Sequence, residues 1–563
     1  MRAFGFCAIF VALGLLMGAC SGPITKPRQP IQEQPVIPPP PPPPPQPAEN
    51  APSPLVRRSL EKQAFGAIVS SGSRLSGGWP QVADTERYRD VVPNGVKSVA
   101  NEPVSTFSID VDTASYGLVR SYLQQGDSPP RDGVRIEELL NYFDYDYPLP
   151  ASREQAFAPF IAMAPSPWGK GKTLLHIGLQ GFAEAKPARP PLNLVLLLDV
   201  SGSMDQPNKL PLVKQSIKIL ADQLSAKDRI AIAVYAGAAG SVLDPTPGDQ
   251  KAKILAALDG LSAGGSTAGG AGLALAYNLA ERNFDKASVN RVIIATDGDF
   301  NVGITSDQRL EDFVAAKRET GIYLTVLGFG RGNYNDALMQ TLAQKGNGNA
   351  AYIDTLAEAR KVLHDEIQAS LFPIADDVKI QIEFNPARVA EYRLIGYETR
   401  ALAREDFAND RVDAGEVGAG ASVTAIYELT PKGGQTLFEP LRYQSGTAPS
   451  AAAPSDEIAF LRVRHKPPGR DASRLIERAI QAKEASQSLA AAPEATRFAI
   501  AVAAYGQLLR GDPYLDKAFG FDQVISLANG AKGSDEFGWR AEFVQLARAA
   551  AAIAPSPPAE TGR

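Results

Sequence analysis

Residues 192–204, LNLVLLLDVSGSM, constrain the fold of this chain more than any other stretch. They open with a near-continuous apolar run of strand length, which is typical of a strand buried on both faces of a parallel sheet. The run ends at Asp199, and Ser201 and Ser203 follow it around Gly202, which allows a tight turn. Oxygen-bearing side chains on alternate positions suit a hard divalent cation, and ligands bind at the carboxyl end of such strands. The stretch therefore predicts an open α/β sheet with a metal-binding edge.

Strand-like and helical patterns alternate from residue 192 to residue 370. Strands are expected at 193–199, 229–235, 291–296, 323–328 and 351–353, and helices at 208–224, 250–258, 271–282, 307–319, 334–343 and 355–370. Strands that alternate with helices form right-handed βαβ units. The fold class predicted for this region is α/β, with a doubly wound, mostly parallel, Rossmann-like sheet.

Two further loops carry oxygen ligands beside predicted elements of this sheet. The sequence GGST ends at Thr267, shortly before the helix expected at 271–282. The sequence ATDG contains Asp297 and follows the strand expected at 291–296. Strand-to-helix junctions of a doubly wound sheet open toward one edge, so these loops are expected to meet the loop that carries Asp199.

The three loops together resemble the metal-ion-dependent adhesion site of von Willebrand factor type A (VWA) domains, whose pattern is DxSxS…T…D. All five positions are filled. The resemblance implies that Ser201, Ser203 and Thr267 bind the ion directly or through water, and that Asp199 and Asp297 lie next to it or one ligand away. It also implies Mg²⁺, with Mn²⁺ or Ca²⁺ as alternatives, and a coordination shell that an acidic side chain of a partner protein completes.

The likeness extends beyond the VWA region. Residues 105–116 (STFSIDVDTASY), 457–469 (EIAFLRVRHKPPG) and 503–515 (AAYGQLLRGDPYL) are similar to bacterial YfbK-like VWA lipoproteins. Strand-like segments on both sides of the VWA region suggest that it is inserted into a β-sandwich built from the two flanks. Helices are expected to dominate after residue 470, beginning with one at 472–489.

The resulting domain organisation has seven parts. They are a lipoprotein signal peptide (1–19), a proline-rich linker (20–54), an N-terminal VWA-associated region (55–185), the VWA domain (186–372), a β-rich domain (373–468), a C-terminal helical region (469–553) and a disordered tail (554–563). The proline-rich linker includes eight consecutive prolines at 38–45 and is expected to be an extended tether.

The N-terminal residues are typical of an export signal. A basic Arg2 precedes an apolar run at 3–17, which is too short to span a membrane and is followed by Gly-Ala-Cys at 18–20. Cys7 would be removed with this signal, which leaves Cys20 as the only thiol and the expected site of lipidation. The end of this segment resembles a bacterial lipobox, which implies a chain that is lipid-anchored in a bacterial envelope. By resemblance to enterobacterial lipoproteins, Ser21 implies the outer membrane, with the chain facing the periplasm or the surface. An ordinary signal peptide with an incidental cysteine is the alternative.

No catalytic residues are expected, and the chain is predicted not to be an enzyme. The sequence lacks HExxH and GxSxG arrangements, and its three histidines stand in unrelated contexts. The segment DVDT, with Asp110 and Asp112, partly matches a phosphatase motif, but Thr113 comes one place too early. We expect Asp112 and Thr113 to cap the helix that follows.

Binding to a protein partner is the function that the sequence favours. The net charge of −5 gives no general attraction to nucleic acid. A structural scaffold for envelope complexes is one alternative, and a metal-dependent hydrolase that uses Asp110 and Asp112 is another.

Overall fold

The computed structural model describes residues 85–109, 111–152, 154–183, 189–266, 269–298, 307–439, 456–470 and 472–554. The signal peptide, the linker, Cys20, Asp110, Thr267 and the tail after residue 554 lie outside these described residues. Among the helices in the described ranges, none is long and apolar enough to cross a membrane.

The α/β region contains the parallel sheet expected from the sequence. Its order is β10-β9-β8-β5-β6-β7, and only the edge strand β7, which the sequence analysis missed, runs antiparallel to its neighbour. The strands are β5 (Leu192–Asp199), β6 (Arg229–Tyr235), β7 (Ala239–Pro247), β8 (Val289–Thr296), β9 (Ile322–Phe329) and β10 (Ala350–Ile353). In the parallel register Leu196 lies between Ile232 and Ile293, which puts β5 in the middle of the sheet.

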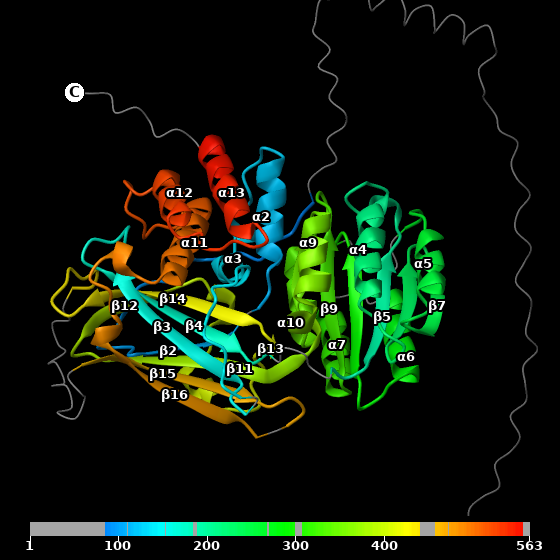
Figure 1. The fold of residues 1–563 in the computed structure, drawn as a ribbon, viewed down its shortest axis with the longest axis horizontal. Coiled ribbons are helices and arrows are strands. Elements are labelled where there is room, and N and C mark those ends of the chain that lie inside the picture. Colours follow the sequence, from blue (N-terminus) through cyan, green and yellow to red (C-terminus); the bar gives the residue numbers. More distant parts are fainter. Residues whose placement is uncertain are drawn as a thin grey trace, which may run out of the picture. The chain divides into compact units, whose positions relative to one another are not determined.

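Both faces of β5 are buried because alternate side chains enter two different cores. Leu194, Leu196 and Leu198 pack with helices on one face, and Val195 and Leu197 pack with helices on the other. The first group of helices comprises α4 (Leu210–Asp222), α5 (Lys251–Asp259) and α9 (Leu356–Arg360), and the second α6 (Gly269–Arg282), α7 (Asp307–Glu319) and α8 (Asp336–Lys345). Figure 1 shows α4, α5, α6, α7 and α9, in shades of green, beside β5, β7 and β9. The fold is therefore α/β, with the doubly wound, mostly parallel sheet that the sequence predicted.

The closing helix expected at 355–370 is interrupted. It consists of α9, a π-helical turn η3 (Lys361–Asp365) and α10 (Ile367–Leu371). The wider turn carries Lys361 inward, where its ammonium pairs with Glu366 and lies 4.1 Å from the centroid of the Trp539 ring. Helical periodicity could not predict this contact, because its partner Trp539 belongs to a distant part of the chain.

Two sheets outside the VWA region form a β-sandwich. One has the order β1-β12-β14-β4-β3, and the other has the order β13-β11-β15-β16 with β2 paired to β11. The strands are β1 (Lys97–Ser98), β2 (Val104–Ser108), β3 (Phe157–Pro165), β4 (Thr173–Gly181), β11 (Pro373–Phe384), β12 (Val389–Ile395), β13 (Gly415–Gly418), β14 (Ser422–Pro431), β15 (Glu457–Lys466) and β16 (Arg474–Gln481). Ile177 and Val423 of the first sheet share one core with Ile380 and Leu461 of the second. Each sheet combines strands from before and after the VWA region, so the VWA region is inserted into the sandwich.

The helix expected at 472–489 is wrong, because this segment forms β16 at the edge of the sandwich. Ile476 and Ile480 contact the sandwich core, whereas Leu475 is exposed. This alternation has the period of a strand. Pairing with β15 outweighs the helix preference of the Glu- and Ala-containing sequence. The sandwich therefore continues past residue 468, where the sequence analysis ended it.

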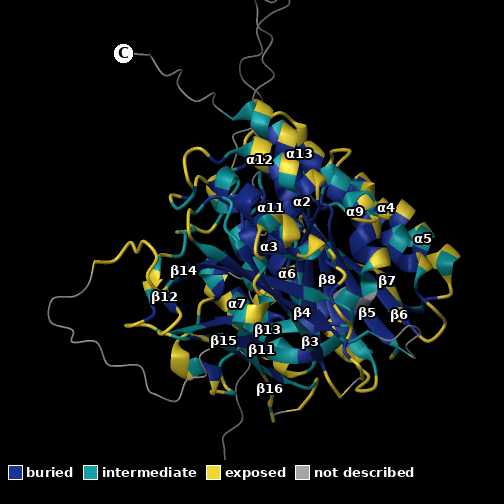
Figure 2. Cartoon of the chain, turned by 60° about the vertical axis from the view of Figure 1, so that its left-hand side comes forward, coloured by how far each residue is buried: buried dark blue, intermediate teal, exposed yellow. Residues whose placement is uncertain are grey.

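Helices from both ends of the chain cover one sheet of the sandwich (Figure 1). They are α2 (Ala114–Gln124), α3 (Ile136–Asn141), α11 (Glu494–Arg510), α12 (Phe521–Asn529) and α13 (Trp539–Ile553). Their core contains Phe143, Phe498 and Phe543, with edge-to-face ring centroids 5.0 to 5.6 Å apart. Figure 2 shows α11 as largely buried, whereas α12 and α13 each expose one face. Short 3-10 turns are η1 (Arg131–Gly133), η2 (Gly202–Met204), η4 (Glu398–Arg400), η5 (Arg404–Phe407), η6 (Ala482–Glu484) and η7 (Leu489–Ala491).

Candidate metal centre

Asp199 stands at the carboxyl end of β5 and is completely buried. One oxygen of its carboxylate accepts a hydrogen bond from the Ser201 amide at 2.8 Å, and the other accepts one from the Thr296 hydroxyl at 3.2 Å. The hydroxyl oxygens of Ser201 and Ser203 are 3.1 Å apart. The turn after β5 thus gathers a carboxylate and two hydroxyl groups at one end of the strand.

The carboxyl group of Asp199 has a raised pKa. Burial raises its pKa to about 6, against hydrogen bonds from Ser201 that lower it, and the charge of Asp297 raises it further. A nearby cation would stabilise the charged form of such a buried carboxylate. Thr296, which donates to Asp199, is the residue before Asp297, so the two carboxylates stand at the ends of neighbouring strands.

The second predicted loop is hydrogen bonded to the turn after β5. The Gly264 amide donates to the Val200 carbonyl at 2.8 Å, and the Gly202 amide donates to the Gly265 carbonyl at 3.0 Å. Gly265 has a φ of +84°, which is costly for any other residue. These bonds bring the loop beside the serines. Thr267 follows two residues later and lies outside the described residues, so its part in the site stays a prediction.

The third predicted loop contributes Asp297, which follows β8 and is completely buried. The next residue, Gly298, has a φ of +96°, and a Cβ there would lie 2.3 Å from the Asn335 amide nitrogen. The loop is therefore packed against the residue that caps α8. Asp297 thereby shares the carboxyl edge of the sheet with Asp199.

A lysine that the sequence analysis missed also belongs to this site. The Lys209 ammonium lies 2.9 Å from the Asp297 carboxylate and 3.0 Å from the side-chain oxygen of Asn333. Only 2% of the Lys209 side chain is exposed. The sequence contains a signal for this position, because Lys209, the residue before α4, stands four and eight positions before the buried Val213 and Ile217.

These residues fit a hard divalent cation. Two buried carboxylates and two hydroxyl groups lie on two loops at the same edge of the sheet, and oxygen donors of this kind are what Mg²⁺, Mn²⁺ and Ca²⁺ prefer. The cationic Lys209 already faces one carboxylate, which is a sign of the negative potential there.

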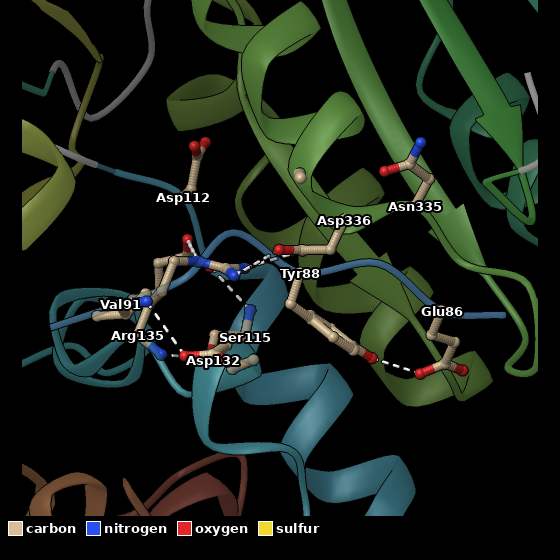
Figure 3. Close-up of polar contacts among 12 residues, drawn as sticks. Glu86, Tyr88, Val91, Asp112, Ser115, Asp132, Arg135, Asn335 and Asp336 are labelled. Carbon is tan, nitrogen blue, oxygen red and sulfur yellow. Dashed lines mark hydrogen bonds and ion pairs between the residues drawn. The ribbon is translucent and has the colours of Figure 1, made fainter. Parts of the chain in front are cut away.

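An N-terminal strap, residues 85–91, lies along the loop that supplies Asn333. Arg87 forms a parallel bridge with Asn335, and the Glu86 carboxylate accepts a 2.6 Å hydrogen bond from the Gly332 amide. Figure 3 shows Tyr88 donating to Glu86, and Arg135 reaching Asp336 at the start of α8. The edge of the sheet is thus supported by residues from outside the VWA region.

Asp112 has a structural role in this arrangement. Its carboxylate accepts hydrogen bonds from the Ala350 amide at 2.7 Å and from Arg400 at 3.3 Å. The expected capping of α2 by Asp112 and Thr113 is not what the structure contains, because Thr113 occupies the cap position without a side-chain hydrogen bond. Glu138 accepts the Ser115 amide instead.

The histidines are scattered, as the sequence suggested. His176 is buried between Tyr147 and Thr496, His465 is buried against Phe157, and His364 is partly exposed on η3. None of the three lies in the cluster around Asp199 described above.

A separate acidic cluster lies where β11 meets β13. Carboxylate oxygens of Asp377, Asp413 and Glu416 lie within 4.8 Å of one another. Lys466 pairs with Asp377 at 2.6 Å, and Arg318 pairs with Asp413 at 2.7 Å. Two of the three carboxylates thus already have cationic partners.

Comparison with known proteins gives matches along most of the described chain. The family descriptions that match are von Willebrand factor at residues 82–176, von Willebrand factor type A domain at 193–368, and uncharacterized protein YfbK, C-terminal, at 369–553. The uncharacterized protein YfbK of Escherichia coli K12 is 46% identical over 468 residues, which cover 82% of this chain and 80% of that protein. The uncharacterized protein sll0103 of Synechocystis is 31% identical over 186 residues, 33% of this chain and 43% of that protein.

A solved structure, of von Willebrand factor type A from Catenulispora acidiphila, is similar over 71% of this chain and 91% of that one. The sequence identity is 15% and the TM-score is 0.40.

Proposed function

Because the chain belongs to the YfbK-like family of bacterial VWA proteins, we propose that it binds a partner protein through a divalent ion at the edge of its VWA sheet. A VWA domain supports a protein-interaction or scaffold role. The involvement of a metal ion and of an acidic group on the partner goes beyond that role and is our proposal.

The observation that carries this proposal is the placement of Asp199, Ser201 and Ser203 on the turn after β5, beside the end of the neighbouring strand β8, where Asp297 follows Thr296. These four residues, together with Thr267, would hold the ion, which is Mg²⁺ in our proposal, with Mn²⁺ or Ca²⁺ as alternatives. When bound, the ion supplies a coordination position for one further oxygen ligand. The chain itself supplies the burial that strengthens such a contact.

We further propose that the protein is a lipoprotein of the bacterial envelope, anchored through Cys20 at the outer membrane and facing the periplasm or the surface. The apolar segment before Cys20 and the proline-rich stretch after it support this location. Labelling of growing cells with a palmitate analogue tests it, because Cys20→Ser should abolish incorporation of the label.

Crosslinking in cells tests the binding function. The wild type and the variants Asp199→Ala and Asp297→Ala would be crosslinked, and captured proteins identified by mass spectrometry. We expect a partner that is lost in both variants and after chelation with EDTA. Asp413→Ala serves as the matched control, since it removes a carboxylate from the separate acidic cluster. A partner recovered equally from all variants would refute the metal-dependent contact.

A scaffold role is the second candidate, and a specific contact favours it. Arg120 of α2 joins Asp354 and Glu358 at the end of the VWA region to Glu542 of α13. The VWA region is therefore firmly connected to the rest of the molecule. Partner capture that survives both EDTA and Asp199→Ala would favour this role. We also propose that the chain is not an enzyme, since Asp112, which the hydrolase alternative needs, is bound to Ala350 and Arg400.

A further inference from the structure

Lys209 is a buried cation inside the candidate metal centre. Its ammonium lies 2.9 Å from the Asp297 carboxylate, and both side chains are almost completely buried, with 2% and 0% exposed. Placing a charge in such a position is costly unless a partner compensates it. Lys209 and Asp297 therefore form a pair in which each charge depends on the other.

The loop after β9 is built to receive this lysine. Gly330 has a φ of +70°, and a Cβ there would lie 2.5 Å from both Cγ and Cε of Lys209. The lysine stem thus lies directly on the Gly330 backbone. Asn333 from the same loop accepts a second hydrogen bond from the ammonium at 3.0 Å. The Gly330 backbone and the Asn333 side chain therefore hold the Lys209 ammonium in one position.

The pair determines the charge of the site. Asp199 and Asp297 contribute two negative charges, and Lys209 returns one positive charge, which leaves one net negative charge among these buried groups. A divalent ion would turn this into one net positive charge. Without Lys209 the site with its ion would be neutral.

We infer that Lys209 is a specificity-determining residue. It weakens the binding of the metal, but it leaves the metal-loaded site with one positive charge, which a single carboxylate of the partner neutralises. This inference rests on the proposed function and adds the charge of the ligand. It predicts that loss of Lys209 has opposite effects on the two binding steps. The metal binds more tightly because a repelling charge is gone, and the carboxylate binds more weakly because the site is neutral.

Two measurements on the full chain in detergent test this. Free Mn²⁺ measured by electron paramagnetic resonance gives the affinity for the metal alone. Acetate, titrated into the Mn²⁺-loaded protein and followed by water-proton relaxation, gives the affinity for a carboxylate. For Lys209→Met we expect Mn²⁺ to bind about tenfold more tightly or better, and acetate about tenfold more weakly.

Two further variants make the test robust. Lys209→Gln removes the charge but keeps a hydrogen-bond donor for Asp297, and it serves if Lys209→Met does not fold. Lys218→Met is the matched control, because it removes the same charge from α4, the helix that directly follows Lys209, where Lys218 pairs with the exposed Asp259. This control should match the wild type in both measurements.

The outcomes separate this inference from the proposed function. The inference would be overturned if both Lys209 variants bound Mn²⁺ no more tightly than the wild type does. It would also be overturned if the Mn²⁺-loaded variants bound acetate as tightly as the loaded wild type, or if the loaded wild type bound no acetate. A wild type that binds no Mn²⁺, while Lys209→Met binds it, would refute the proposed function and support the effect of Lys209 on the metal. Absence of Mn²⁺ binding in every variant would refute both.

Discussion

Replacing Arg120 with methionine tests how the VWA region is joined to the remainder of the chain. The Arg120 guanidinium lies 2.5 Å from Asp354, 2.7 Å from Glu358 and 3.0 Å from Glu542. The side chains of Arg120, Asp354 and Glu358 are 5% exposed or less. Methionine matches much of the volume of arginine but leaves two acidic groups buried without their main cationic partner.

The expected loss of stability is about 3–5 kcal/mol, which is typical when one partner of a buried ion pair is removed. Equilibrium unfolding in urea, followed by circular dichroism, measures it. Lys97→Met is the control, because Lys97 and Glu102 form an exposed pair at 2.7 Å, with 48% and 59% of the side chains exposed. Such a pair contributes about 0–1 kcal/mol.

A double variant sharpens the interpretation. Adding Glu358→Gln to Arg120→Met removes one of the uncompensated charges, so part of the lost stability should return. If Arg120→Met costs no more than Lys97→Met, the cluster does not hold the VWA region in place, and the reasoning is refuted.

Three other predictions concern separate parts of the molecule. Burial lowers the pKa of His176 from 6.5 to about 3, so the folded protein keeps this ring neutral where the unfolded chain protonates it. The stability contributed in this way is complete above pH 6.5 and is lost as the pH falls, so at pH 5 the wild type should lose about 2 kcal/mol more than His176→Gln does, relative to pH 7, in urea unfolding. Gly298→Ala should destabilise the protein by about 2–4 kcal/mol, measured as a lower thermal midpoint, because its Cβ would lie 2.3 Å from the Asn335 amide nitrogen at a φ of +96°; an unchanged midpoint would contradict this packing. Glu86→Ala should speed hydrogen exchange at the Gly332 amide, because this amide donates a 2.6 Å hydrogen bond to the Glu86 carboxylate, while exchange in β5 stays as in the wild type. If the Gly332 amide exchanges equally fast in the variant and the wild type, the strap is not held there.

Much of the fold could be predicted from the sequence because hydrophobic patterns are strong where strands are buried on both faces. The strand at Arg229–Tyr235 and the helix at Asp307–Glu319 have the bounds that were expected. The sandwich was also predictable as strand-like segments on both sides of the VWA region. The edge strands β7 and β16 were not, because β7 is half exposed and β16 is stabilised by pairing with β15.

The residues that could hold a metal were predictable from the sequence, but the positive charge that Lys209 adds beside them was not. The motif positions of Asp199, Ser201, Ser203 and Asp297 are meaningful because loops at one edge of a parallel sheet converge. Lys209 was overlooked because a lysine at the start of a helix is usually exposed. Its burial depends on Asn333 and Gly330, which lie more than a hundred residues away in the sequence.

Binding of Mn²⁺ to the full chain and to its carboxylate variants tests the central claim most directly. We expect the wild type to bind one ion per chain, Asp199→Ala and Asp297→Ala to lose it, and Asp413→Ala to keep it. Mn²⁺ binding that persists unchanged in Asp199→Ala and disappears in Asp413→Ala would contradict the assignment of the metal to the edge of the VWA sheet.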